Sequence, residues 1–319
     1  MLRLTVHPFI SAKRTSKKAA CGLKIACWNV RTLQDNNASL ERKTAIVARV
    51  LGNYNIDIAA LSETRFPGTG ELEEVSGGYT YFWSGKPPEE DRQSGVGFAI
   101  RTEIARNLES LPTGVNDRLM TLRLSTENGQ HITLISCYAP TMTNSEQKKE
   151  SFYTNLRTIL SSVPYHDQII LLGDFNARVG KEDHIWPGVL GRHGIGKMNT
   201  NGLLLLSLCS EFDLAITNTL FQQANKHKTS WKHPRSNHWH MLDYVIVRRR
   251  DIKSVHQTRS MCTAEYLSDH KLIRSKFSFP FVPKKRILTV KMRKKVNVAL
   301  LKDPAECEVF AKALNDKLA

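Results

Sequence analysis

The sequence predicts an α/β protein in which helices cover β-sheets within one domain. Short apolar runs alternate with amphipathic segments along most of the 319-residue chain. Turn residues such as Asn128-Gly129 separate several of these runs at the spacing typical of hairpins. Three longer segments carry helical periodicity and interrupt the series of strands. Strands at hairpin spacing interleaved with helices are typical of sheets covered by helices.

The expected strands share a short apolar or alternating pattern with turn residues on either side. They are residues 23–29, 56–61, 95–100, 119–124, 131–138, 168–174, 214–217, 241–247 and 272–279. The expected helices are residues 39–52, 145–161 and 201–212. In the first helix, Val47 and Leu51 recur at helical spacing, Ser39 is a suitable N-cap and Gly52 a suitable stop.

Charge divides the chain into a body and two basic flanks. The 46 Lys and Arg residues against 30 Asp and Glu give a net charge of +16. Residues 1–24 and 284–319 each contribute +6, and the remaining +4 is spread over residues 25–283. We therefore expect a basic tail at 1–22, a domain at 23–280 and a basic, linker-like tail with a short helix at 281–319. Such flanks are suited to binding a polyanion, or serve only to keep a protein in solution.

Several classes of protein do not fit this sequence. No apolar run approaches the roughly 20 residues that a membrane-spanning helix needs, and the first ten residues lack a signal-peptide pattern. The six cysteines form no Cys-x-x-Cys pair, which argues against a zinc ribbon or disulfide scaffold. We expect an intracellular protein, and the basic clusters at 13–18 and 284–286 favour a nuclear location.

Polar side chains recur at the ends of the expected strands, where a rigid sheet holds a group in place. Taken singly, such a residue is usually a helix cap or a turn former. Six positions of this kind are better explained by a shared site. The residues are Asn29, Glu63, Tyr138, Asp174 with Asn176, Asp243, and Asp269 with His270.

This set of carboxylates, amides, a phenol and an imidazole suits metal-assisted hydrolysis of a phosphate ester. Mg²⁺ (or Mn²⁺) prefers oxygen ligands, which Glu63 and Asp269 offer. Asp174 is placed to activate water as a general base. Donors for the charged transition state are Asn176, Tyr138 and protonated His270. A carboxylate such as Asp243 would raise the pKa of the histidine and orient its ring.

Read in order, these motifs resemble the endonuclease/exonuclease/phosphatase superfamily over residues 23–279. The most specific are Gly173-Asp174-Phe175-Asn176 and Ser268-Asp269-His270, with Leu242-Asp243-Tyr244-Val245 between them. The resemblance implies a four-layer α/β sandwich of two packed mixed β-sheets flanked by helices, with a Mg²⁺ site at one edge.

The same resemblance implies a role for each matching residue. Glu63 would be a metal ligand with Asn29 beside it, and Asp269 a further carboxylate near the metal. Asp174 would activate water, and Asp243 would be the partner of His270. The phosphate contacts would be Asn176, Tyr138 and His270.

A closer resemblance is to the apurinic-like endonuclease domains of non-LTR retrotransposons. It rests on a loop that runs from Trp186-Pro187-Gly188 through Gly191-Arg192-His193-Gly194 to Asn199-Thr200-Asn201-Gly202. One position departs from the repair enzymes, which have an acidic residue where Arg31 stands. A cation there would weaken a second metal site, so cleavage at abasic sites is more in doubt than metal-dependent nicking.

Two other patterns in the sequence give weaker evidence of function. Met198 replaces the Ser or Thr of a nucleotide-binding loop after Lys197, so no nucleotide cofactor is expected. His227, His233, His238 and His240 lack zinc-ligand spacing and fit a loop that faces nucleic acid.

Three further residues are candidate contacts to nucleic acid. Trp231 either stacks on DNA or packs in the core, and packing is favoured because large aromatics are mostly buried. Arg31 and Arg118 either clamp phosphates or are merely solvated.

Three functions remain open from the sequence. The leading hypothesis is a Mg²⁺-dependent endonuclease that nicks one strand of DNA, with no membrane partner. The second is a phosphatase or phosphodiesterase acting on a small phosphorylated substrate. The third is a non-catalytic relic that binds nucleic acid. No pattern in the sequence predicts an oligomeric state.

Overall fold

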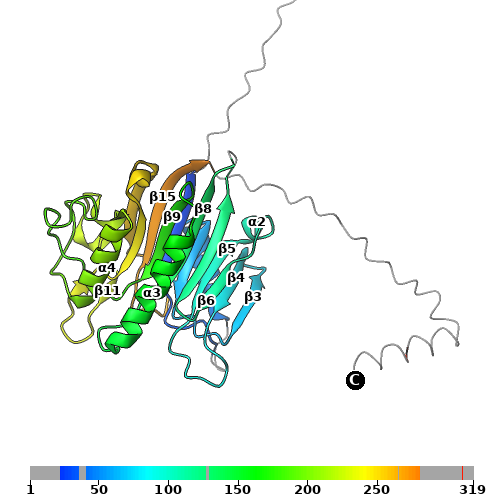
Figure 1. Cartoon of the computed structure of the whole chain (residues 1–319). Helices are drawn as coiled ribbons and strands as arrows, with labels where there is room; N and C mark the ends of the chain where they lie inside the picture. Colours follow the sequence, from blue (N-terminus) through cyan, green and yellow to red (C-terminus); the bar gives the residue numbers. More distant parts are fainter. Residues whose placement is uncertain (1–21, 36–40, 127–128, 265, 281–310, 312–319) are drawn as a thin grey trace, which may run out of the picture. The chain divides into compact units, whose positions relative to one another are not determined.

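Two β-sheets pack face to face in the computed structural model, which describes residues 22–35, 41–126, 129–264, 266–280 and 311 (Figure 1). The expected tails, the helix expected near the C-terminus, Ser39 and Asn128 lie outside the described residues, apart from Gly22 and residue 311. Within the described part of the chain, no helix is both long and apolar enough to cross a membrane.

The first sheet has seven strands in the order β14-β15-β1-β2-β5-β4-β3. Strands β1 and β2 are parallel, and the other pairs are antiparallel. The parallel register pairs Asn29 with Ser62, so the carboxyl ends of β1 and β2 meet at one edge. The strands are β1 (Gly22–Asn29), β2 (Ile58–Ser62), β3 (Thr69–Glu74), β4 (Tyr79–Ser84), β5 (Val96–Arg101), β14 (Val255–Met261) and β15 (Leu272–Pro280).

The second sheet has six strands in the order β10-β13-β9-β8-β7-β6. Strands β8 and β9 are parallel, and their register pairs Tyr138 with Asp174. Strand β13 runs antiparallel to β9, so its first residue, Asp243, also lies opposite Asp174. The strands are β6 (Thr113–Asn116), β7 (Leu119–Ser125), β8 (His131–Tyr138), β9 (Gln168–Asp174), β10 (Leu214–Ile216) and β13 (Asp243–Arg248).

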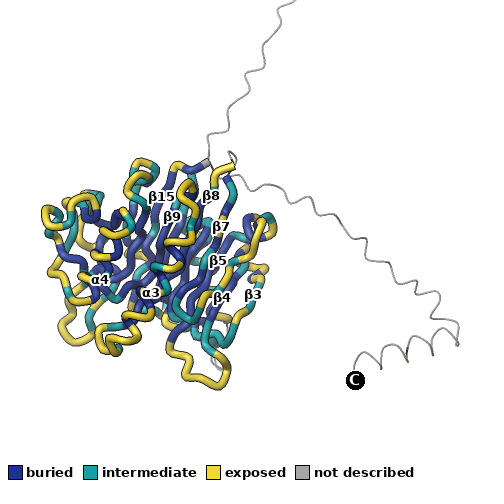
Figure 2. Tube along the Cα trace, in the orientation of Figure 1, coloured by how far each residue is buried: buried dark blue, intermediate teal, exposed yellow. Residues whose placement is uncertain are grey.

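Helices cover the outer face of each sheet, which completes the four layers. Helix α1 (Lys43–Asn53) packs on the seven-stranded sheet through Val47 and Leu51, in an apolar cluster with Trp28. Helices α3 (Glu146–Ser162) and α4 (Thr200–Glu211) pack on the six-stranded sheet. A third apolar cluster fills the space between the sheets, and the strands appear as the buried interior in Figure 2.

Short elements complete the described part of the chain. They are α2 (Thr102–Ala105), the 3₁₀ helices η1 (Thr217–Thr219), η2 (Asn225–His227) and η3 (Arg249–Ser254), and a small hairpin of β11 (Trp231–Lys232) and β12 (Trp239–His240). The fold confirms the predicted class of two mixed sheets flanked by helices.

Several predicted boundaries need correction. Helix α1 begins at Lys43, later than expected, because Asp35 Oδ1 accepts the Lys43 N–H and caps the helix from the preceding loop. Gly52 lies inside its last turn and does not end it. Strands β3, β4, β6 and β14 were not predicted at all. Strands β3 and β14 are the two edges of their sheet, so their polar residues do not give the apolar pattern of a buried strand.

The placement of two site residues also differs from the prediction. Asp243 begins β13, and His270 precedes β15, so neither of them closes a strand. Both residues still lie at the end of the sheets where Asn29 and Asp174 are found, because β15 runs antiparallel to β1 and β13 runs antiparallel to β9. The expectation of a shared edge thus holds for a different topological reason.

Candidate active site

The strand ends surround a cleft of about 880 Å³. Glu63 reaches it from the end of β2, Asp174 from the end of β9, and Asn176 from the loop after β9. Asp269 and His270, from the segment before β15, complete the predicted part of its lining, together with Arg31 and Trp231. The structure therefore brings together most of the residues that the sequence singled out.

One amide links a carboxylate of the seven-stranded sheet, Glu63, with a carboxylate of the six-stranded sheet, Asp174. Asn29, fully buried at the end of β1, donates from Nδ2 to Glu63 Oε1 at 2.8 Å and to Asp174 Oδ2 at 3.0 Å. The Tyr138 hydroxyl donates to Glu63 Oε1 at 2.9 Å. Both donors hold Glu63 by the same oxygen, which leaves Oε2 facing Arg65 Nη2 at 3.3 Å.

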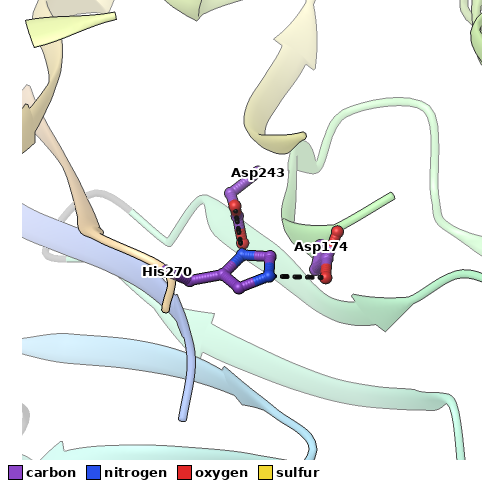
Figure 3. Close-up of side chains that lie close together, drawn as sticks. All are labelled: Asp174, Asp243 and His270. Carbon is purple, nitrogen blue, oxygen red and sulfur yellow. Dashed lines mark hydrogen bonds and ion pairs between the residues drawn. The ribbon is translucent and has the colours of Figure 1, made fainter. Parts of the chain in front are cut away.

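Asp174 also belongs to a second buried chain, with His270 and Asp243 (Figure 3). His270 Nδ1 lies 2.9 Å from Asp243 Oδ2, and His270 Nε2 lies 3.9 Å from Asp174 Oδ2. Asp243 sits behind the imidazole and orients it toward Asp174. The second oxygen of Asp243 is buried and has no hydrogen-bond partner among the described residues.

The electrostatic environment keeps the imidazole charged. Burial acts to lower the pKa of His270, but the Asp243 and Asp174 carboxylates outweigh it and raise the pKa to about 10. Burial and the Asp243 charge raise the pKa of Asp174 to about 7, against the opposing effect of His270. The site therefore places an imidazolium beside a carboxyl group that exchanges its proton near neutral pH.

We expect the charge of His270 to depend on Asp243. In metal-free buffer, the imidazole nitrogens of His270 should titrate near pH 10, well above the ordinary histidine value of about 6.5. Asp243→Asn should lower that pKa by more than one unit. Asp269→Asn should lower it less, because Asp269 interacts with His270 more weakly than Asp243 does. Nitrogen-detected NMR across the pH range measures both shifts. A wild-type midpoint near 6.5 would contradict the assignment.

Several residues that line the cleft have an unusual backbone conformation. Arg31, Glu63, Arg65 and Asn176 all have φ between 47° and 59°, a region that non-glycine residues rarely adopt. Such strain is typical of functional sites, where packing holds an unfavourable conformation. At Gly173, just before Asp174, φ is 145° and a Cβ would meet Cys137 O at 1.9 Å, so only glycine fits between β8 and β9.

Asn176 is held by its backbone and side chain together. Its N–H donates to Asp174 Oδ1 at 2.9 Å, and its Nδ2 donates to Ala139 O at 3.0 Å. Asn201, at the start of α4, donates to the Asn176 carbonyl at 3.0 Å. The retrotransposon-like loop therefore fixes the position of Asn176 at the cleft.

Trp231 lines the cleft and does not belong to any of the three apolar clusters, so the prediction that it packs in the core is wrong. Its indole N–H donates to Asp269 Oδ2 at 2.9 Å. Arg31 Nε lies 3.8 Å from Asp269 Oδ1, so both residues converge on this carboxylate.

Arg118 lies outside the cleft, contrary to its grouping with Arg31 and Trp231. Its guanidinium covers the ring of Tyr138 at 4.9 Å and donates to the Tyr138 carbonyl at 3.1 Å. It lines a neighbouring pocket with Lys86 and Lys148. Arg118 thus contacts the site through Tyr138.

Some cleft residues were not singled out as site residues from the sequence. Arg65 and Arg178 line it, as do Thr141, Asn199 and three of the four clustered histidines, namely His233, His238 and His240. A weak signal existed for two of them, because Arg65 and Arg178 each stand two positions after a predicted site residue. The position of these histidines at the cleft depends on the β11–β12 hairpin, which no sequence pattern predicts.

The donor set fits a hard divalent cation. Glu63 and Asp269 offer carboxylate oxygens in the cleft, the ligand type that Mg²⁺ prefers. One potential ligand atom from each of Asp174, Asp243 and His270 lies within 4.8 Å of the other two, which is also compatible with a metal. However, His270 Nδ1 is already bonded to Asp243, so we interpret this second group as a proton-transfer chain.

Comparison with known proteins identifies the class. Residues 26–270 match the Endonuclease/Exonuclease/phosphatase family, and the chain belongs to this family of phosphoester hydrolases. It is 33% identical over 267 residues to Craniofacial development protein 2 of Bos taurus. That alignment covers 84% of this chain and 42% of the relative, so the chain spans less than half the length of this curated protein.

Solved structures show the same fold. The catalytic domain of Xenopus laevis APE2 is similar with a TM-score of 0.59 at 17% identity, over 83% of this chain and 94% of that one. The endonuclease domain of TRAS1, a telomere-specific non-LTR retrotransposon, is similar with a TM-score of 0.54 at 15% identity, over 81% and 99%. The superfamily resemblance inferred from the sequence motifs is confirmed.

Proposed function

We propose that the protein is a Mg²⁺-dependent endonuclease that nicks one strand of DNA and leaves a 3′-hydroxyl. The observation that carries the proposal is the position of Asp174. It is buried at the cleft between the Asn29–Glu63 pair and the His270–Asp243 pair. This arrangement holds a base, a charged donor and a metal-type carboxylate within one site.

Asp174 is the general base that takes a proton from the attacking water. Its pKa of about 7 suits this role, because a base is most effective when its pKa lies near the working pH. The Asn29 amide and the Asn176 N–H hold one carboxylate oxygen each, which fixes the orientation of the group.

Asn176 and His270 stabilise the negative charge that develops on the phosphate, and Tyr138 joins them where its hydroxyl exchanges Glu63 Oε1 for a phosphate oxygen. His270 donates as an imidazolium, which Asp243 keeps protonated. Burial and the Glu63 charge raise the pKa of Tyr138 well above its ordinary value, so its hydroxyl remains a donor. Preorganised donors of this kind usually give the largest single contribution to catalysis.

Glu63 is the principal Mg²⁺ ligand, with Asn29 beside it. Asp269 is a second candidate ligand, and the oxygens of both carboxylates also have protein partners in this structure. When bound, Mg²⁺ supplies positive charge that stabilises the developing oxyanion. The location of Arg31 beside Asp269 favours a single metal at Glu63 over a pair.

DNA is the substrate that the charge and the cleft lining favour. Arg31, Arg65 and Arg178 add positive charge to the cleft, and Trp231 offers a partly exposed ring for stacking on a base. The net charge of +16 favours a polyanion. A nuclear location follows from this substrate and from the basic clusters in the sequence.

Substrate choice tests the proposal. With Mg²⁺, the full chain should convert supercoiled plasmid to nicked circles and should release no phosphate from a soluble inositol phosphate. Gel electrophoresis and a phosphate assay measure the two activities. Phosphate release without nicking would assign the site to a small substrate, and neither activity would favour a non-catalytic relic.

A further inference from the structure

A cluster of positive side chains lies on the seven-stranded sheet, away from the cleft. Arg274 and Lys276 alternate along β15, with Arg259 opposite Arg274 on β14 and Lys24 opposite Lys276 on β1. Residues directly opposite one another, or two apart on one strand, point to the same face of a sheet. The four cations, which we call the β15 stripe, therefore share one face.

This is the outer, helix-covered face of the sheet. Ala26 is opposite Arg274 on β1, and Ala26 belongs to the apolar cluster that α1 covers. The stripe begins where that cluster ends, and its four side chains are partly exposed. Lys276 is four residues along β15 from Leu272, the first residue of the strand. This places Lys276 about 13 Å from the end of β15 that lies at the cleft.

The positive charges of the stripe are poorly compensated. No described carboxylate lies within ion-pair distance of the side chains of Arg259, Arg274, Lys276 or Lys24. Asp57 accepts from the Lys24 backbone N–H and pairs with Arg101. The Nη2 of Arg259 lies 2.8 Å from His227 Nδ1.

Two further observations show that the four cations are crowded together. The Nε atoms of Arg259 and Arg274 are buried and have no hydrogen-bond partner among the described residues. The neighbouring Arg274, burial, and then Lys24 and Arg259 lower the pKa of Lys276. Like charges directly opposite one another destabilise a sheet, and a bound polyanion would offset that repulsion.

We propose that the β15 stripe binds the phosphate backbone of nucleic acid outside the cleft. Arginine and lysine side chains at regular strand spacing match a chain of repeated phosphates, and both side chains bind phosphate through charge-assisted hydrogen bonds. The stripe goes beyond the proposed function, since it anchors DNA that extends from the cleft and takes no part in hydrolysis.

Binding measured without cleavage tests the stripe. The probe is a fluorescein-labelled duplex of about 30 base pairs in EDTA, with affinity followed by anisotropy over a range of salt concentrations. The triple variant Arg259→Gln, Arg274→Gln, Lys276→Gln should bind about tenfold or more weakly at low salt. Its log–log salt slope should fall by about 2.7, because each phosphate contact contributes about 0.9.

The matched control removes three cations that already have carboxylate partners. Arg49, Arg106 and Arg157 pair with Glu41, Glu73 and Glu211, so Arg49→Gln, Arg106→Gln, Arg157→Gln should leave the slope unchanged. Thermal unfolding checks that both triple variants fold. Equal slopes for the two variants, or no binding of the duplex by the wild type, would overturn the proposal.

The stripe and the proposed function can fail independently of each other. If the stripe variant loses affinity but the wild type never nicks DNA, the stripe stands and the endonuclease proposal fails. If the wild type nicks DNA and the stripe variant binds like its control, the endonuclease proposal stands and the stripe fails.

Discussion

Replacing Asp174 with asparagine is expected to lower the single-turnover rate of DNA nicking by about three powers of ten. The change keeps the shape of the side chain but removes the group that accepts a proton from water. Loss of a positioned general base typically costs about 10²–10⁴ in rate. The measurement is the conversion of supercoiled to nicked plasmid with enzyme in excess over DNA.

A surface variant controls for unspecific effects of the same substitution. Asp213 is exposed, pairs with Arg249 and has a φ of 52°, which asparagine adopts readily. Asp213→Asn should nick DNA at the wild-type rate. Thermal unfolding should show that Asp174→Asn is folded. A folded Asp174→Asn protein that nicks at the rate of Asp213→Asn would refute the mechanism assigned to Asp174.

Glu63→Gln is expected to have the second-largest effect, a loss of about two powers of ten or more at ordinary Mg²⁺ concentrations. A glutamine Oε1 still accepts from Asn29 and Tyr138, and only the ion pair of Oε2 with Arg65 is lost. The negative charge that attracts the cation does not survive. The plasmid assay should therefore require a much higher Mg²⁺ concentration for half-maximal rate.

The control for Glu63 is Glu71 on the exposed edge strand β3. Glu71→Gln should leave both the rate and the Mg²⁺ dependence unchanged. A Glu63→Gln protein with a normal rate and a normal Mg²⁺ dependence would show that the metal ligand lies elsewhere, with Asp269 the next candidate.

The buried strands were predictable because their sequences are nearly all apolar. Strands β8 and β9 have the predicted boundaries, since both are buried on two faces in the middle of their sheet. The edge strand β14, with sequence Val-His-Gln-Thr-Arg-Ser-Met, could not be predicted in this way. Its pairing is set by the neighbouring β15, and no local pattern encodes that contact.

The candidate site was predictable in its composition more than in its geometry. Asn29, Glu63 and Asp174 are far apart in the sequence, and only the sheet registers show that one amide bonds both carboxylates. The position of Trp231 depends on the β11–β12 hairpin, whose two-residue strands are too short to leave a pattern. The location of the Arg118 guanidinium over the Tyr138 ring likewise depends on the pairing of β7 and β8.

The metal requirement of nicking is the most direct test of the chemistry assigned to the cleft. The measurement is the single-turnover rate of plasmid nicking by the wild-type chain in Mg²⁺, in excess EDTA, and after Mg²⁺ is restored. We expect nicking in Mg²⁺, no detectable nicking in EDTA, and full recovery on restoration. Nicking at an undiminished rate in EDTA would contradict the assignment of Glu63 as a metal ligand and the proposed function with it.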